Sequence, residues 1–165
     1  MIKRRLWAGL VLWVITVLPL PAATVSFLVI ETGLPSEMEN NVYSSLWESG
    51  LFDVFFEAGH IVSNAPIKRL DKKPQKPFPD EVRKDLNEAA DGGAEYFILA
   101  LLDYPQAAAN ETPKPRNISL RIFKVSPYKL LYEQRYSDKA SADIDEEFVT
   151  IKQSIRGLVP HLADK

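Results

Sequence analysis

Few side chains in this sequence could carry out catalysis: there are two histidines, His60 and His161, and no cysteine. The missing cysteine excludes disulfides, thiolate zinc sites, iron–sulfur clusters and cysteine nucleophiles. Ser63 follows His60 by three residues, a spacing that places the two side chains on opposite faces of a strand. No Gly-x-Ser-x-Gly motif occurs. We therefore find no recognisable nucleophile–base pair, and we expect His60 to lie in a loop or at a strand end.

Acidic residues cluster at Asp143, Asp145, Glu146 and Glu147, which could suggest a cation site. These residues open a segment expected to be helical, and the positive end of a helix dipole favours carboxylates in the first turn. The spacing of a calcium-binding loop is absent. Gly92-Gly93 precedes an expected strand rather than opening a helix, which is the wrong context for a phosphate-binding loop. The sequence therefore predicts no metal site and no cofactor.

The first 23 residues have the layout of a secretory signal peptide. Residues 3–5 are basic, residues 6–18 are apolar apart from one threonine, and a Pro-Leu-Pro-Ala-Ala stretch follows. The apolar run is shorter than the ~20 residues that span a bilayer. We expect export to the periplasm with cleavage after Ala22 or Ala23; the alternative is that the segment remains as a membrane anchor.

Residues 24–165 are expected to form a single domain, because 46% of the chain is apolar and 25% is charged, as in ordinary globular proteins. Hydrophobic patterning predicts strands at 25–30, 52–56, 96–102, 118–123 and 130–136. It predicts helices at 36–50, at 80–91 and from Asp143 onward. Residues 59–64 either continue the second strand or form a short extension. The expected fold class is α/β (α+β): a single mixed sheet of about five strands with three packed helices, in the order β-α-β-α-β-β-β-α.

The ends of the first helix are predicted from local signals. Ser36 and Glu39 fit a capping box at its start, and Gly50 is well placed as its C-terminal stop. Because helices alternate with the early strands, the first three strands should be parallel, and the last two should form an antiparallel hairpin. The carboxyl ends of the parallel strands then share one edge of the sheet, where ligands of open α/β sheets tend to bind.

Two proline-containing loops at that edge, 66–79 and 105–116, carry net charges of +4 and +1. The chain from residue 24 onward has 17 basic and 22 acidic residues, so these loops form a basic rim on an acidic body. Such a charge distribution attracts an anionic surface. We expect a partner-binding site, for an envelope protein or an anionic envelope surface and not for nucleic acid, at Lys68, Arg69, Lys72, Lys73, Lys76, Lys114 and Arg116.

Three short stretches carry a family resemblance: Gly50-Leu51-Phe52-Asp53-Val54, residues 93–99 (Gly-Ala-Glu-Tyr-Phe-Ile-Leu), and Arg121-Ile122-Phe123-Lys124-Val125 with the Leu130-Leu131-Tyr132 that follows it. They resemble the second strand, the central strand and the hairpin of the small α/β domain found at the amino terminus of TolB and in CsgG-like and LpoB-like envelope proteins. The resemblance implies a non-catalytic adaptor or assembly factor of the bacterial envelope. Phe55-Phe56-Glu57 departs from the acidic–basic pair that is frequent in the family, and the propeller of TolB and a lipobox are absent.

The predicted function is therefore a non-catalytic, exported binding or adaptor module of the bacterial cell envelope, active in envelope assembly or in a periplasmic protein complex. The alternative is a small periplasmic hydrolase that uses carboxylates or His60. A cleft with converging ionisable groups would favour the enzyme, and an exposed charged or apolar face would favour the adaptor. A membrane contact is expected only through an uncleaved leader, and the sequence leaves the partner and the oligomeric state open.

Overall fold

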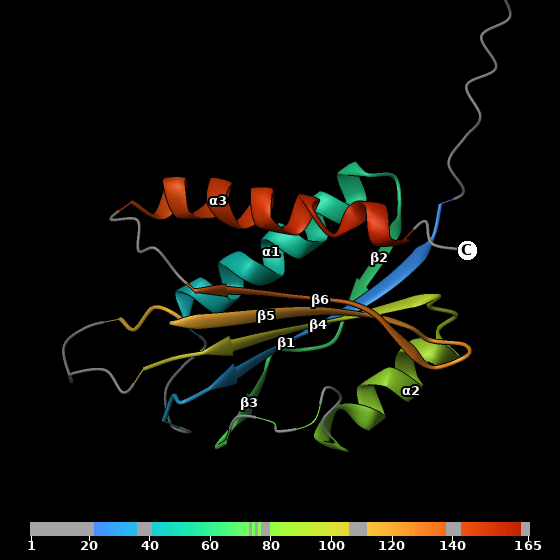
Figure 1. The fold of residues 1–165 in the computed structure, drawn as a ribbon, viewed down its shortest axis with the longest axis horizontal. Helices are drawn as coiled ribbons and strands as arrows, with labels where there is room; N and C mark the ends of the chain where they lie inside the picture. Colours follow the sequence, from blue (N-terminus) through green and yellow to red (C-terminus); the bar gives the residue numbers. More distant parts are fainter. Residues whose placement is uncertain are drawn as a thin grey trace, which may run out of the picture.

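The structure, a computed structural model, describes residues 22–35, 41–72, 74, 76, 80–105, 112–137 and 143–162. In these ranges one mixed sheet of six strands lies between α1 and α3 on one face and α2 on the other (Figure 1). The strands are β1 (Thr24–Thr32), β2 (Ile61–Asn64), β3 (Lys68–Leu70), β4 (Tyr96–Asp103), β5 (Asn117–Lys124) and β6 (Lys129–Ser137). The helices are α1 (Val42–Glu57), α2 (Arg83–Asp91) and α3 (Ile144–Arg156), with 3-10 turns at Asp80–Val82 and Val159–Leu162. The predicted fold class is confirmed, with one more strand than expected.

The centre of the sheet is the parallel pair β1 and β4, in register from Val25 opposite Tyr96 to Thr32 opposite Asp103. On its other side β1 pairs in parallel with β2 along its first half and with β3 along its second half. β5 and β6 extend the sheet antiparallel beyond β4. β1, β3 and β4 therefore end at the same edge, after Thr32, Leu70 and Asp103. We call this the loop edge (left in Figure 1).

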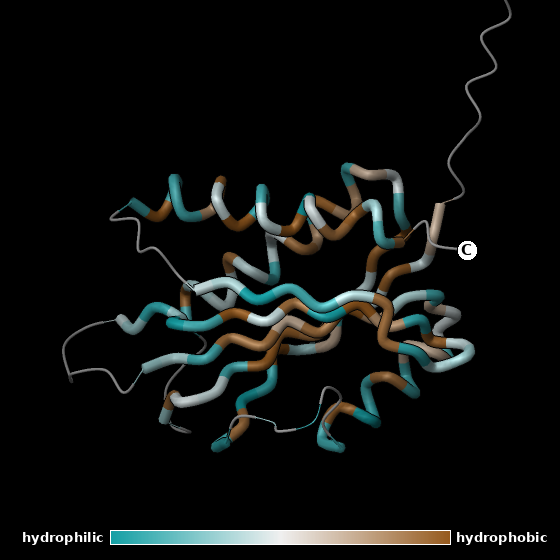
Figure 2. The backbone as a smooth tube through the Cα atoms, in the orientation of Figure 1, coloured by the Kyte–Doolittle hydropathy of each residue, from teal (hydrophilic) through white to brown (hydrophobic). Residues whose placement is uncertain are grey.

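β1 and β4 are almost continuously apolar because they are covered on both faces. Val25, Phe27 and Val29 of β1 belong to the core under α1 and α3, whereas Leu28 and Ile30 belong to the core on the side of α2. β6 is the edge strand on the side of the sheet opposite to β2 and β3, and it is mostly hydrophilic (Figure 2). None of the helices within the described ranges is long and apolar enough to cross a membrane.

The prediction for residues 52–56 is wrong: they are the last turns of α1 and not a strand. Aromatic and β-branched residues favour strands locally, but packing decides here. At helical spacing, one face of α1 is buried against the sheet through Trp47, Leu51, Val54 and Phe55. The part of the resemblance that treated residues 50–54 as a second strand is corrected in the same way.

Both predicted ends of the first helix also change. Gly50 lies inside α1 rather than at its end. It permits a close approach of α3, because a Cβ at this position would lie 2.9 Å from Cγ2 of Ile151. The helix begins at an Asn41 cap, whose side chain accepts a hydrogen bond from the N–H of Tyr43 at 2.9 Å. The predicted Ser36 cap lies outside the described residues.

The second strand of the chain is instead β2, at the position of the short extension that the sequence left open. β3 lies inside the segment 66–79, which was predicted to be a loop. Three residues, Lys68-Arg69-Leu70, carry too little periodicity to predict a strand. The other predicted elements are confirmed, and Asp143 caps α3 by accepting a hydrogen bond from the N–H of Asp145.

Candidate functional site

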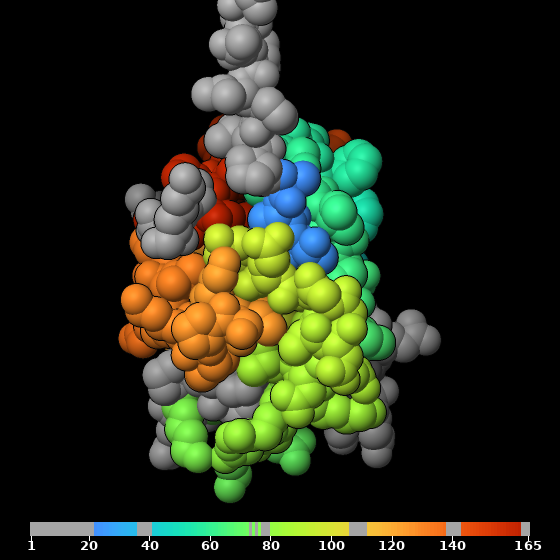
Figure 3. All heavy atoms as spheres, turned by 90° about the vertical axis from the view of Figure 1, so that its right-hand side faces the viewer, coloured from blue at the N-terminus to red at the C-terminus, as the bar shows by residue number. Residues whose placement is uncertain are grey.

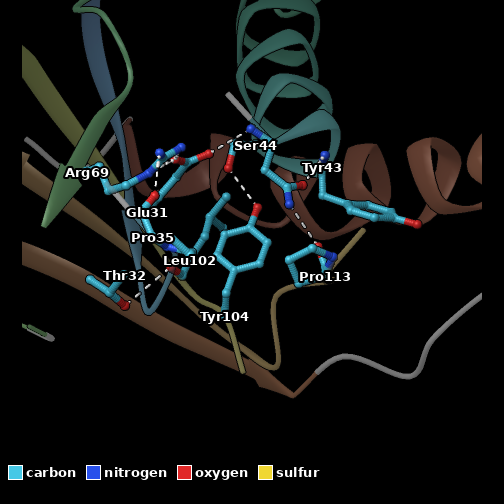
Figure 4. Close-up of polar contacts among 10 residues, drawn as sticks. Glu31, Thr32, Pro35, Tyr43, Ser44, Arg69, Leu102, Tyr104 and Pro113 are labelled. Carbon is cyan, nitrogen blue, oxygen red and sulfur yellow. Dashed lines mark hydrogen bonds and ion pairs between the residues drawn. The ribbon is translucent and has the colours of Figure 1, made fainter. Parts of the chain in front are cut away.

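A mostly buried polar cluster lies at the loop edge, and we call it the edge cluster: Glu31, Arg69, Asn41, Ser44 and Tyr104. Figure 4 labels four of them, Glu31, Arg69, Ser44 and Tyr104. Glu31, near the end of β1, is fully buried. Its Oε2 accepts hydrogen bonds from Nε of Arg69 at 2.9 Å and from Nη2 at 2.6 Å. Nη1 of Arg69 also donates to the backbone carbonyl of Pro35 at 2.9 Å. This charge pair therefore ties β3 and residues 33–35 to the end of β1.

Asn41 joins three parts of the fold at one buried position. Its backbone N–H donates to Oε1 of Glu31 at 3.2 Å, and its side-chain oxygen caps α1. Its side-chain nitrogen donates to the backbone carbonyl of Pro113 at 2.9 Å. The start of α1, the end of β1 and the segment before β5 are thus held together by a single asparagine.

Tyr104, directly after β4, completes the edge cluster. Its hydroxyl lies 2.7 Å from Oγ of Ser44 on α1. Burial raises the pKa of Tyr104 far above its ordinary range, although the hydrogen bond with Ser44 opposes this effect. Gly33, with φ at +86°, packs so tightly on Tyr104 that a Cβ would overlap its carbonyl oxygen. Tyr104 therefore stays protonated and acts as a hydrogen-bonding anchor between α1 and the loop edge.

Three of the predicted partner-binding cations are engaged inside the fold. Lys68 forms an ion pair with the buried carboxylate of Asp85 on α2, and Arg69 pairs with Glu31 as described. Nζ of Lys114 lies 3.9 Å from the carboxylate of Glu147 on α3 and 5.1 Å from the ring centre of Tyr43 on α1. These cations fasten the loop-edge segments to the helices and to β1.

Of the predicted partner-binding cations that the structure describes, three are exposed at this edge: Lys72, Lys76 and Arg116, which we call the rim cations. Lys76 forms a solvent-exposed ion pair with Asp80 at 2.9 Å. The backbone N–H of Arg116 donates to the carbonyl of Asp103 at 2.7 Å, which fixes its backbone at the end of β4. The ends of β3 and β5 are three strand spacings apart, roughly 14 Å. Lys73 lies outside the described residues.

A polar surface that sequence analysis did not assign adjoins the loop edge on the face of α2. The half of this face near the loop edge forms a cavity of about 350 Å³ whose lining includes Thr32, Asp103, Asn117, Ser119, Arg121 and Arg135. The alternation of polar and apolar residues in 118–123 was the sequence signal for it. Such an alternation indicates that one face of a strand is more polar than the other, and it does not indicate a cavity.

The two arginines that line this cavity share the carboxylate of Glu133. Oε1 of Glu133 accepts hydrogen bonds from Nε of Arg121 and Nε of Arg135, both at 3.1 Å, and from Oγ of Ser119 at 3.2 Å. Burial alone would raise the pKa of Glu133, but the hydrogen bonds and charges of the two arginines outweigh it and lower that pKa. Glu133 is therefore ionised at neutral pH and satisfied within the sheet, an arrangement suited to a structural ion pair rather than to a general acid.

Both histidines have structural contacts away from the loop edge. Nδ1 of His60 accepts a hydrogen bond from the N–H of Ala23 at 3.2 Å, just before β2, which confirms the predicted loop position. Burial lowers the pKa of His60, with an opposing effect from the charge of Glu95. His161 stacks on the ring of Tyr132 with centroids 3.7 Å apart. Within the described ranges, no group of three or more His, Asp or Glu side chains is arranged to hold a metal ion.

Fold and site together define a mixed α/β domain with a braced, partly basic loop edge. The chain matches no protein-family model and no curated protein. Matching solved structures include a PelC dodecamer from Paraburkholderia phytofirmans, with 12% identity over 87% of this chain and 89% of that chain and a TM-score of 0.44. The LpoB C-terminal domain from Escherichia coli matches at 12% identity over 72% of this chain and 84% of that chain, with a TM-score of 0.41. TolB from Acinetobacter baumannii matches at 12% identity over 86% of this chain and 28% of that chain, with a TM-score of 0.38. LpoB and TolB, which the sequence resembles, are thus among the solved structures that this chain matches.

Proposed function

We propose that the protein is an exported, non-catalytic binding module of the bacterial cell envelope that holds an acidic face of an envelope protein at its loop edge. The observation that carries this proposal is the exposure of Lys72 and Arg116 on segments that the edge cluster holds in place, together with the exposure of Lys76. A basic surface on an otherwise acidic chain steers an anionic partner toward that surface.

The geometry favours binding over hydrolysis. A hydrolase needs a nucleophile within hydrogen-bonding reach of a base. Nδ1 of His60 is occupied by a main-chain N–H, and His60 precedes β2 at the end of the sheet opposite to the loop edge. At the loop edge itself, the ionisable groups Glu31 and Arg69 are bonded to each other. These pairings support a rigid surface rather than a reacting centre.

The chemistry of the rim favours a protein partner over a lipid surface. Asp71 and Asp80 are exposed beside the rim cations. A uniformly anionic layer of lipid headgroups would be repelled by these two carboxylates. An acidic protein face can place its own charges between them, which is how complementary protein surfaces select their partners.

The test compares two charge-matched double variants of the chain from residue 23 onward. Lys72→Ser with Arg116→Ser removes two rim cations. Lys84→Ser with Lys129→Ser removes two exposed cations, one on α2 and one at the far end of β6. Each exposed ion pair contributes roughly 0.2–1 kcal/mol, so the rim variant should lower the affinity for the envelope protein about two- to thirty-fold.

Capture from envelope extracts, measured by mass spectrometry at low and high salt, reads out this difference. The rim variant should capture less of the same protein with a weaker salt dependence, because fewer charges are screened, and the control variant should behave as wild type. Equal behaviour of the two variants would reject the loop edge as the binding site. Flotation with phosphatidylglycerol vesicles provides the second arm: vesicle binding that follows the same variants would assign the rim to a membrane instead.

A further inference from the structure

Ala23, directly before β1, is anchored in the fold by its side chain and its main chain. Ala22 is exposed, whereas Ala23 is 7% exposed and packs in the core under α1 and α3. The N–H of Ala23 donates to Nδ1 of His60 at 3.2 Å, and its carbonyl accepts from the N–H of Ile61 at 3.0 Å. Figure 3 looks at this end of the molecule, where the start of β1 emerges between the segments at α1 and β2 and those at α2 and β4. The contacts that tie Ala23 to the fold therefore include its main-chain nitrogen.

We propose that the leader is removed at the Ala22–Ala23 bond and that the new amino terminus of Ala23 docks on His60. Water is the second reactant: the amide bond breaks, the carboxylate remains on Ala22 of the released leader, and the ammonium group forms on Ala23. The sequence alone leaves cleavage after Ala22 and after Ala23 as alternatives, and the contacts of Ala23 separate them. This inference rests on the export that forms part of the proposed function.

Cleavage one residue later would remove contacts that the fold uses. Loss of Ala23 would delete a buried methyl group and both hydrogen bonds, leaving Nδ1 of His60 and the N–H of Ile61 without these partners. Cleavage after Ala22 keeps every one of these atoms and converts the amide nitrogen into an ammonium nitrogen at the same place. A charge-assisted hydrogen bond to a nitrogen acceptor is stronger than a neutral one.

The surroundings of Ala23 suit a positively charged terminus. An ammonium group needs an acceptor with a free lone pair, and burial favours the neutral form of His60 that provides one. Glu95 supplies a negative charge that acts on the same imidazole. Its backbone N–H donates to the carbonyl of Thr24 at 2.8 Å, which fixes its backbone beside the first residues of β1. An acceptor and a counter-charge are therefore both present where the terminus would form.

The first experiment identifies the terminus directly. The full chain is expressed in a Gram-negative host, the periplasmic and membrane fractions are separated, and the intact mass and the amino-terminal peptide are measured. We expect a periplasmic protein whose first residue is Ala23. A periplasmic protein that begins at Thr24 would overturn the site while leaving export and the proposed function standing. A full-length chain in the membrane fraction would overturn both the cleavage and the export on which the proposed function depends.

The second experiment tests the docking of the terminus. Chains that begin at Ala23 and at Thr24 are produced from a tag that leaves no extra residue, each with and without His60→Ala, and are unfolded in urea. Two hydrogen bonds at about 1 kcal/mol each correspond to about a thirty-fold larger folding equilibrium constant for the chain that begins at Ala23. His60→Ala should lower that constant more in the Ala23 chain than in the Thr24 chain. Equal stability of the two chains, or an equal effect of His60→Ala in both, would reject the docked terminus.

Discussion

Breaking the Glu31–Arg69 pair should destabilise the protein strongly. Glu31→Leu removes the carboxylate that accepts two hydrogen bonds from Arg69 and one from the N–H of Asn41. The side chain of Arg69 is only 15% exposed, so its charge would remain largely buried without this partner. Removing one member of a buried ion pair costs about 3–5 kcal/mol. That is a large fraction of the roughly 5–15 kcal/mol by which a typical domain is stable.

A double-mutant cycle separates the pair from other effects of the substitutions. Arg69→Met should cost a similar amount, because it leaves the carboxylate of Glu31 buried without its cation. Replacing both residues together removes both charges, and well-packed apolar side chains often substitute for a buried pair at little cost. The double variant should therefore be more stable than the sum of the single losses predicts, by at least about 2 kcal/mol.

Urea unfolding followed by circular dichroism at pH 7 measures all four proteins of this cycle. The control is the exposed pair of Lys84 and Glu88, whose side chains are 82% and 61% exposed. Replacing both of these residues should cost less than about 1 kcal/mol. Our reasoning would be refuted if the Glu31 and Arg69 substitutions added without coupling, or if each cost no more than the control.

Two further predictions concern single positions. Gly33→Ala should destabilise the protein clearly more than Gly59→Ala in urea unfolding. Both glycines have positive φ, which costs other residues about 1–2 kcal/mol, but only at Gly33 would the added Cβ overlap the backbone of Tyr104. Equal losses of stability in the two variants would contradict this packing. Burial lowers the pKa of His60 below 6.5 in the folded protein, so the unfolded chain takes up the proton first as the pH falls. The stability that neutral His60 contributes is therefore complete above about pH 6.5 and is lost as the pH drops through the folded-state pKa. Urea unfolding at pH 7.5 and pH 5.0 should show this loss in the wild type and a smaller one in His60→Gln, and an equal loss in both would exclude His60 as its source.

The elements that could be predicted from the sequence are those whose local pattern matches their final environment. β1 and β4 are apolar runs that end up buried on both faces, and β5 alternates because only one of its faces is fully covered. Asp143 is a good helix cap in any context, and it caps α3. In these cases propensity, periodicity and burial all favour the same structure, so the local sequence is sufficient to predict it.

The last turns of α1 could not be predicted as helix because the apolar residues of this helix do not lie on one face. Trp47 and Phe55 point into the core, but Phe52 and Phe56 are 42% and 65% exposed and stack on each other with ring centroids 6.0 Å apart. A helix that is apolar on two faces lacks the 3.6-residue periodicity by which helices are recognised. The consecutive aromatics then favour a strand locally, and only packing against the sheet and α3 selects the helix.

The basic loops could be predicted from their net charge alone, but the carboxylates that pair with their cations could not be predicted. Glu31 and Arg69 are 38 positions apart in the chain, and they meet because β3 pairs with the second half of β1. Lys114 and Glu147 meet only once α3 has packed over the sheet. A sum of charges counts all cations of a loop equally, whereas the fold separates those that brace the loop edge from those that face solvent.

The separation of paired cations from exposed cations is an argument for the binding role that we propose for the loop edge. Association loses less free energy when the contacting side chains stand on backbone that is already fixed, because less ordering remains to be done on binding. Lys68, Arg69 and Lys114 use their charges to fix the segments that carry Lys72 and Arg116. A loop edge without these braces would present the same net charge but would have to order itself around each partner. The same five residues therefore explain both how these segments are attached to the fold and how exposed positive charge remains on them.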